Sequence, residues 1–274
     1  MVDLSASLPP RTRARTSAAS WWERPALWRG LAIPVALLIA WFVVTRLGLI
    51  SSHLLVSPEK LVALPFVDEA GRHVWFALGE SVVRLVAGFA IGATAGIALG
   101  LLLGTSQAAN RAIGPSVNGL RQITLFAWIP LLTAWFGNGD SSKIVYIALS
   151  AFFPTALNTY EGLRTIPAHY LEVARVLQLS WRQRIVRLLL PGALPSIFIG
   201  IQIALITAWI GTVGSEYAMG VGRGIGTFMA GGREQFRMDV VLLGVIILAV
   251  VGYVINVICG RVFRRLLHWQ GSPS

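Results

Sequence analysis

The residues of this chain that could do chemistry are suited to recognition rather than to covalent catalysis. The sequence has no Walker pattern (G-x-x-x-x-G-K followed by Ser or Thr) and no H-E-x-x-H pattern. No spacing of serine, histidine and aspartate indicates a nucleophile. Cys259 is the only cysteine, which argues against a cysteine-based metal site. We therefore expect no enzyme activity, no cofactor and no metal in this chain.

Recognition chemistry is concentrated in one polar stretch between two long apolar segments. The stretch reads EGLRTIPAHYLEVARVLQLSWRQRIVRLLLPGALP and contains five arginines. Two short helices are expected in it. Pro167 suits the first position of one helix, and Ser180 with Gln183 forms a capping box that starts the other. Pro191 and Pro195 are expected to stop the second helix before the next apolar segment.

Two residues of the first predicted helix are candidates for docking a cytoplasmic partner. Glu172 lies in the early turns, where the helix dipole favours a carboxylate, and Ala174 is small enough to let another surface come close. The alternative for Glu172 is a local pair with Arg175, which contributes about 0.2–0.5 kcal/mol. Composition alone leaves these two interpretations open.

Apolar segments must position this stretch, and they indicate an all-α integral membrane protein. Only 13% of the residues are charged, against about 25% in soluble domains. Uncharged runs approach or exceed the length of about 17–25 residues that a bilayer span needs. Lipid leaves backbone groups no partner outside a helix or a closed barrel. Six helical spans are predicted at about 30–49, 82–104, 120–137, 143–161, 193–215 and 240–261.

The distribution of charge predicts the orientation of these spans. A net charge of +11 could indicate nucleic-acid binding, but the positions of the basic residues explain it better. Most fall on one side if the N-terminus is inside, which agrees with the positive-inside rule. This places the 162–192 loop and both termini in the cytoplasm. The sequence thus divides into a basic tail, 1–28, and a transmembrane domain, 29–274.

The second predicted span carries a glycine every four residues, which predicts a stripe for close helix packing. An alternative is a gating surface. The glycines are Gly88, Gly92, Gly96, Gly100 and Gly104.

Spacing within the polar stretch resembles the EAA motif of ABC-importer permeases. Glu172-Val173-Ala174 is followed at the family's intervals by position 178 and by Leu190-Pro191. Gln178 stands where the family has a glycine that bends the chain. Beyond the loop, the stretches 80–92, 120–144, 151–163 and 264–269 resemble the sulfonate/taurine/nitrate branch of binding-protein-dependent permeases.

The resemblance implies a non-catalytic permease in the bacterial cytoplasmic (inner) membrane, surrounded by lipid and not by nucleic acid. It implies a homodimer of six-span subunits, a cytoplasmic ABC ATPase dimer that holds ATP and Mg, and an external solute-binding protein. The solute would be a small anion, such as an aliphatic sulfonate, taurine or nitrate. The residues implied in ATPase coupling are Glu172, Ala174, Arg175, Gln178, Leu190 and Pro191.

A path for such an anion should offer hydrogen-bond donors, and five residues are candidates from polarity and depth. They are Trp128, Asn158, Gln202, Trp209 and Glu216. Pro130 is expected to interrupt the third span near Trp128. For Glu216 the alternative is an interfacial acid, solvated or paired with Arg223. For Arg84 and Arg121, charge pairing or snorkelling at the span ends is favoured over attraction of an anion.

The glycine-rich segment 220–226, GVGRGIG, resembles a phosphate loop but lacks the strand and βαβ unit that such a loop requires. A tight return between two spans is expected instead.

Two functions of other classes remain open from the sequence. One is an ATP-independent secondary transporter or channel, against which no inverted repeat is evident. The other is a membrane receptor or assembly anchor whose loop binds a signalling partner.

Overall fold

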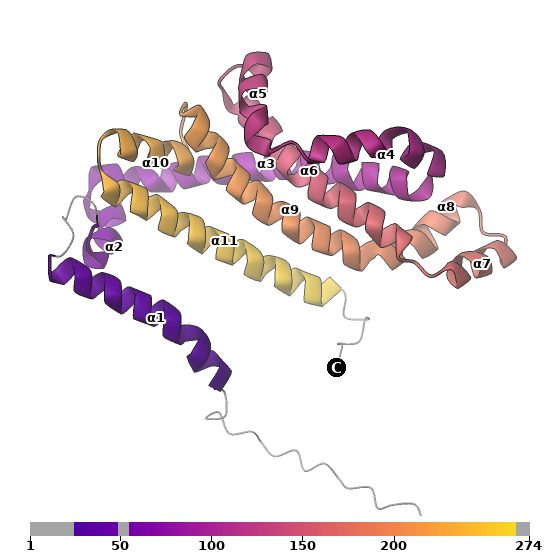
Figure 1. Ribbon diagram of the computed structural model, residues 1–274, viewed down its shortest axis with the longest axis horizontal. Coiled ribbons are helices and arrows are strands. Elements are labelled where there is room, and N and C mark those ends of the chain that lie inside the picture. The colour runs from indigo at the N-terminus through magenta and orange to yellow at the C-terminus, as the bar shows by residue number, and fades with distance from the viewer. Residues whose placement is uncertain (1–24, 49–54, 267–274) are drawn as a thin grey trace, which may run out of the picture. The chain divides into compact units, whose positions relative to one another are not determined.

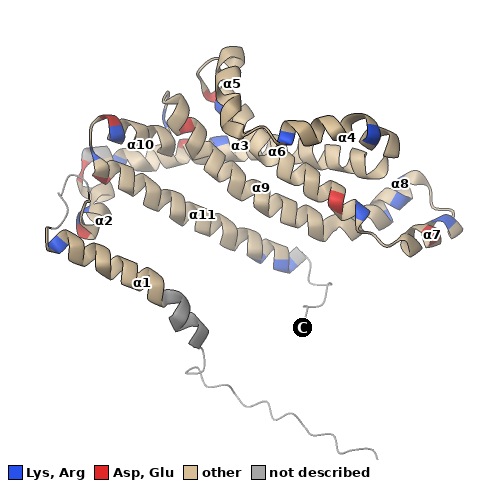
Figure 2. Ribbon diagram, in the orientation of Figure 1, with Lys and Arg blue, Asp and Glu red and all other residues tan. Residues whose placement is uncertain are grey.

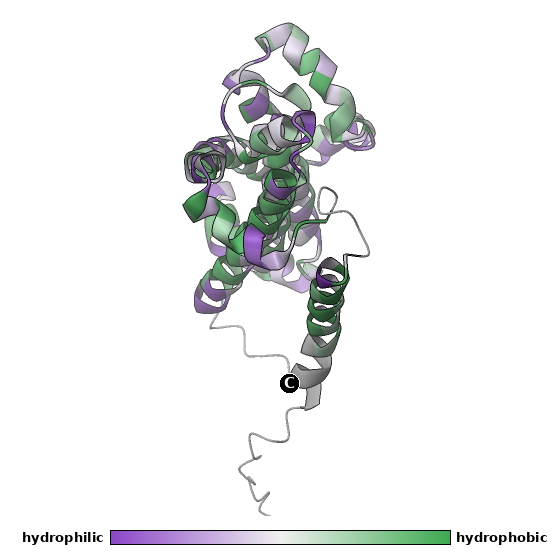
Figure 3. Cartoon of the chain, turned by 90° about the vertical axis from the view of Figure 1, so that its left-hand side faces the viewer, coloured by the Kyte–Doolittle hydropathy of each residue, from purple (hydrophilic) through white to green (hydrophobic). Residues whose placement is uncertain are grey.

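The structure, a computed structural model, describes residues 25–48 and 55–266. The chain divides into two compact units, one up to Ile50 and one from Ser51. The first unit contains α1 (Pro25–Arg46), which is mostly hydrophobic (Figure 3). Its apolar side chains, such as Ile33 and Leu37, are exposed within the unit. A helix that is apolar all round suits a membrane environment. Most of the predicted basic tail, 1–24, lies outside the described residues.

The described part of the second unit contains only helices and turns, which confirms the all-α class (Figure 1). Its elements are α2 (Pro58–Val67), α3 (Glu69–Thr105), α4 (Gln107–Arg121), η2 (Leu125–Trp128), α5 (Ile129–Phe136), α6 (Asp140–Arg164), α7 (Ala168–Val176), α8 (Trp181–Arg184), η3 (Ile185–Leu189), α9 (Leu190–Met219), α10 (Ile225–Glu234) and α11 (Met238–Leu266). Three described helices are long and apolar enough to cross a membrane, over Gly71–Thr105, Trp181–Met219 and Met238–Arg265.

The glycine stripe of α3 lies against α6. A Cβ built on Gly92 would lie 2.1 Å from the carbonyl oxygen of Ala148, so any side chain at position 92 would force the two helices to move. Farther along, Gly104 faces Leu163. Residue numbers therefore rise together along the two helices, and α3 and α6 run parallel.

Helix α9 packs on α6 in the opposite direction. A Cβ on Gly200 would lie 2.7 Å from the Cβ of Asn158, and one on Gly211 would lie 2.6 Å from the hydroxyl of Ser150. Numbers thus rise along α9 as they fall along α6. Small residues again allow two helix backbones to approach closely.

Helix α11 is antiparallel to α9 and so runs in the direction of α3 and α6. The indole Nε1 of Trp209 donates to the carbonyl of Leu248 at 3.0 Å, and Gln202 donates to the side chain of Asn256 at 2.9 Å. One end of the unit therefore collects the ends of α3, α6 and α11 together with α7 and α8. The arginines of α7, α8 and η3, and those near the ends of α6 and α11, gather at this end (Figure 2).

The segment predicted as the third span, 120–137, is broken, but the break falls before Pro130 rather than at it. Since α3 and α6 are parallel, the segment between them must run back along the bundle, and it does so in two parts. Helix α4 ends at Arg121, residues 122–124 are not helical, and η2 with α5 follows. Pro130 lies in the first turn of α5 rather than interrupting a helix, because a first turn does not need the missing N–H.

A short helix precedes α3. It is α2, which buries Leu61 and Pro65. Arg237, just before α11, pairs with Asp68 after α2 and with Asp239 at 2.9 Å. The carboxylates of Asp239 and Asp68 raise the pKa of Arg237 above its ordinary value, so the guanidinium of Arg237 stays positively charged.

Candidate functional site

The polar loop after α6 folds into α7 and α8 at the end of the bundle. Helix α7 begins after Pro167, which is the N-cap and so lies one position before the expected first turn. The predicted capping box of α8 is confirmed. The backbone N–H of Gln183 donates to the Ser180 hydroxyl at 3.4 Å, and the Ser180 N–H donates to the Gln183 side chain at 2.9 Å.

Gln178 bends the chain between the two helices in the left-handed region, with φ at +51°. Its N–H donates to the Arg175 carbonyl at 2.9 Å, and the Leu179 N–H donates to the Ala174 carbonyl at 3.0 Å. These two bonds form the Schellman motif that ends many helices, usually with a glycine at the position that Gln178 occupies. The bend is thus made without a glycine, at a conformational cost of about 1–2 kcal/mol.

The outer face of α7 and the start of α8 expose an apolar patch, which we call the loop patch. It comprises Tyr170, Val173, Val176, Leu177 and Trp181, exposed between 50% and 82%. Glu172 and Arg175 border this patch and are exposed, and no ion pair joins them in the described part of the chain. Ala174 is 2% exposed. Its side chain faces inward, which differs from the expectation that it meets a partner.

The expectation that Pro191 and Pro195 stop a helix is wrong, because α8 continues into α9. The π-helical turn Ile185–Leu189 joins them, so helix runs without a break over Trp181–Met219. Leu190 packs against the cluster of Leu163, Ala193 and Ile197. A π turn widens the helix locally and is frequent at functional sites. Trp181 of the loop patch therefore begins a helix that continues into the bundle.

At the opposite end of α9, charged and polar side chains surround the buried carboxylate of Glu216, and one of them, Asp140, is exposed. We call this set the ion cluster, and it consists of Ser81, Arg84, Asp140, Lys143 and Glu216. Glu216 has no exposed surface. Its carboxylate lies 2.9 Å from Nη1 of Arg84 and 2.8 Å from the Ser81 hydroxyl, and Arg84 Nε donates to Asp140 at 2.8 Å. Buried charges persist when they are paired and hydrogen-bonded in this way.

The glycine segment 220–226 turns the chain over the ion cluster and leads into α10, so the return from α9 to α11 contains a short helix rather than a tight turn alone. The Gly226 N–H donates to Glu216 at 3.0 Å. Arg84 donates to the carbonyl of Arg223 at 2.5 Å, and Lys143 donates to that of Val221. A Cβ on Gly224 would lie 2.3 Å from the Glu216 carboxyl carbon. The glycines thus let the backbone itself serve as the partner of the buried charges.

Glu216 is consequently neither solvated nor paired with the side chain of Arg223, and it lines no open path in the described chain. Its partners include Arg84, for which charge pairing was the favoured interpretation. This cluster could not be found from the sequence, because Arg84 and Glu216 are 132 positions apart. Considered separately, each residue indicates only a charged position near the end of a span.

The other path candidates are not brought together. Trp209 is 1% exposed and belongs to the core between α9 and α11. Gln202 lies at that same interface, whereas Asn158 donates to the Pro154 carbonyl of its own helix at 2.8 Å. Trp128 is half-buried, and its indole Nε1 is buried without a hydrogen-bond partner among the described residues. The four therefore do not line one common surface within the described chain.

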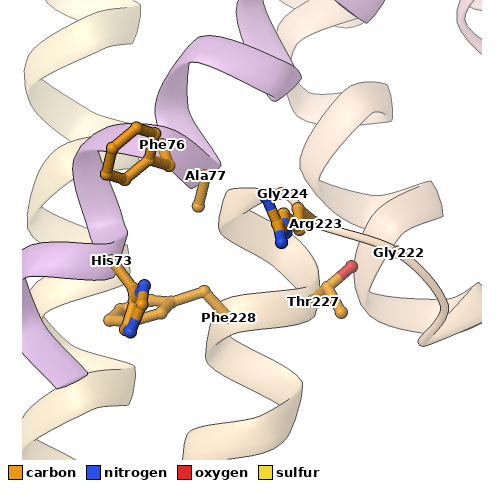
Figure 4. A pocket seen from close by; sticks show the side chains of 8 residues that line it. All are labelled: His73, Phe76, Ala77, Gly222, Arg223, Gly224, Thr227 and Phe228. Atoms are coloured by element: carbon orange, nitrogen blue, oxygen red, sulfur yellow. The ribbon is translucent and has the colours of Figure 1, made fainter.

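A pocket of about 370 Å³ opens beside the ion cluster, between the start of α3 and the 222–228 segment (Figure 4). His73, Phe76, Arg223 and Phe228 are among its lining residues. A second pocket, of about 520 Å³, lies near Asp68 and Arg237. Both pockets lie at the end of the bundle opposite α7 and α8.

Comparison with known proteins agrees with this architecture. The family described as binding-protein-dependent transport system inner membrane component matches residues 92–268. The chain is 35% identical to the putative aliphatic sulfonates transport permease protein SsuC of Bacillus subtilis, over 99% of this chain and 98% of that protein. It is 30% identical to the taurine transport system permease protein TauC of Escherichia coli, over 86% and 87% of the two chains.

Two further comparisons add a relative named for another solute and a solved structure. The bicarbonate transport system permease protein CmpB of Synechococcus elongatus is 30% identical, over 90% of this chain and 92% of that protein. Among solved structures, an inward facing conformation of the MetNI methionine ABC transporter matches with a TM-score of 0.58 and 25% identity. The match covers 77% of this chain and 99% of that chain.

Proposed function

We propose, from the premise that the chain belongs to the family of binding-protein-dependent transport system inner membrane components, that it is the non-catalytic permease subunit of an ABC importer. The observation that carries this proposal is the loop patch on α7 and α8, which is exposed at one end of the bundle and joined to α9 through Trp181. An apolar surface of this kind on an otherwise basic loop fits a protein partner.

Six crossings of the membrane are part of the proposal: α1, α3, the broken segment 106–139, α6, α9 and α11. The alternating directions of the last five support it, since each returns the chain to the opposite end of the bundle. The arginines of the α7–α8 loop and of the end of α11 share one end, which we assign to the cytoplasm by the positive-inside rule. Both termini then lie in the cytoplasm, and the ion cluster lies toward the outside.

This arrangement supports three partners for the chain: a second copy of itself, an ATPase dimer and an external binding protein. Two copies of the chain form the path, and a cytoplasmic ATPase dimer binds ATP and Mg and receives the loop patch of each copy. Glu172 and Arg175 border the contact, and Gln178 sets its angle. An external binding protein delivers the solute at the other end, near the 370 Å³ pocket. Closure of the ATPase dimer moves the two loops together and α9 with them.

The transported solute is a small oxyanion. The importer lies in the bacterial cytoplasmic membrane. Relatives named for aliphatic sulfonates, taurine and bicarbonate support this class. Their solutes share oxygen acceptors on a small, compact group. The binding protein that accompanies the permease is expected to select among them.

Co-purification of the permease with its ATPase tests the docking assignment. Glu172→Lys, which reverses the charge beside the loop patch, should release the ATPase and abolish uptake. The matched control is Glu234→Lys on α10, which is also exposed and lies at the opposite end. Full retention and full uptake in Glu172→Lys would discard the docking assignment. Uptake by the permease alone, without ATPase, would favour a secondary transporter instead.

A further inference from the structure

Arg121, the last residue of α4, is an exposed arginine without a partner. No hydrogen bond or ion pair of its guanidinium is made within the described part of the chain. Arg84 and Arg237 differ from it, since each is paired with carboxylates. Among the described residues Arg121 has no charge pair, one of the two roles favoured for it from the sequence, and it lies where the segment predicted as the third span is broken.

The depth of Arg121 is set by its neighbours on α6. It lines a small cavity of about 30 Å³ together with Asn110 of its own helix and with Phe153 and Ala156 of α6. Phe153 lies near the middle of α6, which runs from Asp140 to Arg164. Arg121 is therefore remote from both ends of the bundle.

A lipid-facing position does not suit an arginine at this depth. The hydrocarbon core is about 30 Å thick, so mid-depth is about 15 Å from either surface, farther than an arginine side chain can extend. Ionisable residues at such depth face the protein interior or a water-filled cavity and mark solute pathways.

The backbone next to Arg121 also indicates that this position lines a water-filled cavity. Residues 122–124 are not helical, and Gln122 and Thr124 are exposed polar residues. Non-helical backbone at membrane depth is tolerated only where protein buries it or where it lines a water-filled cavity. An unpaired cation and a broken helix thus meet at one point of the return segment.

We propose that Arg121 binds the anionic group of the transported solute within the translocation path. Its guanidinium presents five N–H donors in a fixed fork, which matches the oxygens of a sulfonate, nitrate or bicarbonate. Gln122 and Thr124 lie beside it at the break and add neutral donors. This inference rests on the permease function proposed above and assigns that function a solute-binding residue.

Uptake into proteoliposomes tests the role of Arg121. The permease is reconstituted with its ATPase and binding protein, and ethanesulfonate, taurine, nitrate and bicarbonate serve as probes. For the probe that the wild type imports, Arg121→Gln should lower uptake at least tenfold. Arg121→Lys, which keeps the charge but not the fork, should lower it less. The matched control, Arg111→Gln near the start of α4, should keep wild-type uptake.

Chemical labelling supplies a second readout that does not depend on transport. Because Cys259 is the only cysteine, Cys259→Ser provides a cysteine-free background. In it, Arg121→Cys should react with a water-soluble sulfonatoethyl methanethiosulfonate reagent, and an excess of the imported anion should slow the reaction. Arg111→Cys should react without such protection.

Three outcomes separate the possible failures. Wild-type uptake in Arg121→Gln would overturn the assignment of Arg121 while leaving the importer intact. A thiol in Arg121→Cys that never reacts would overturn it as well, because the position would then not be open to water. Failure of the wild type to retain an ATPase or to import any probe would instead refute the proposed function.

Discussion

Gln178 occupies a left-handed backbone position that favours glycine. Its left-handed backbone and its two Schellman hydrogen bonds reproduce the bend of a glycine. The bend is therefore dictated by the hydrogen bonds of the helix end, and the residue type only sets its cost. The EAA-like spacing predicted where the bend falls, although not that Gln178 would adopt it.

Replacing Gln178 by glycine should relieve this strain. We expect Gln178→Gly to transport at or above the wild-type rate and to stabilise the bend by about 1 kcal/mol. Thermal unfolding of the purified complex and solute uptake measure the two effects. Gln178→Ala keeps a Cβ at the same φ, so it is the matched control and should show no gain. Complete loss of transport in Gln178→Gly would show that this geometry does not operate in the working importer.

At the scale of elements, the glycine face of α3 determines how closely it can approach α6. Five glycines contact five successive parts of α6, and their Cβ positions would overlap its atoms. This face was predictable, because a residue repeated every four positions is a local signal. The identity of the partner helix was not, since nothing in the stripe distinguishes α6 from another span.

Gly92→Ala should therefore push α3 and α6 apart. The added Cβ would meet the Ala148 carbonyl at 2.1 Å, a backbone atom that cannot rotate away. Overpacking of this kind costs about 1–3 kcal/mol, so a lower unfolding temperature and less folded protein in the membrane are expected. Gly79→Ala is the control on the same helix, because nothing lies within 4 Å of its Cβ. Equal stability of the two variants would contradict the close contact.

The broken return between α3 and α6 illustrates what sequence cannot specify. The uncharged run that begins after Arg121 continues across η2 and α5, so hydropathy reads it as one span. The break arises because the chain must return between two parallel helices, which is a property of tertiary arrangement. Capping residues such as Ser180 were predictable for the opposite reason, since their partners lie three positions away.

For the whole molecule, the helix Trp181–Met219 connects the loop patch to the ion cluster. At about 1.5 Å per residue, its 39 residues extend for roughly 58 Å. Glu216 is therefore carried by the same helix that presents Trp181 to a partner. Movement at the loop reaches the far end of the bundle only if this helix stays rigid across the π turn.

Arg187, an exposed residue inside the π turn, offers a test of this rigidity. Arg187→Gly weakens the helix there by about 1 kcal/mol relative to alanine. We expect fewer solute molecules imported per ATP hydrolysed, with ATPase binding retained. Arg187→Ala removes the same charge but favours the helix, and it should keep the wild-type ratio. Equal ratios in both variants would show that the π turn does not transmit movement.

The ion cluster also has a consequence for the order in which the chain is made. Arg84, Asp140 and Lys143 are synthesised before Glu216, and the 220–226 segment that supplies the backbone partners comes later still. Until then Asp140 faces both Arg84 and Lys143, at 2.8 and 3.9 Å in the finished protein. Asp140 is thus the acid available to both cations before Glu216 is made, and this end of the bundle closes only once Glu216 and the 220–226 segment have been synthesised.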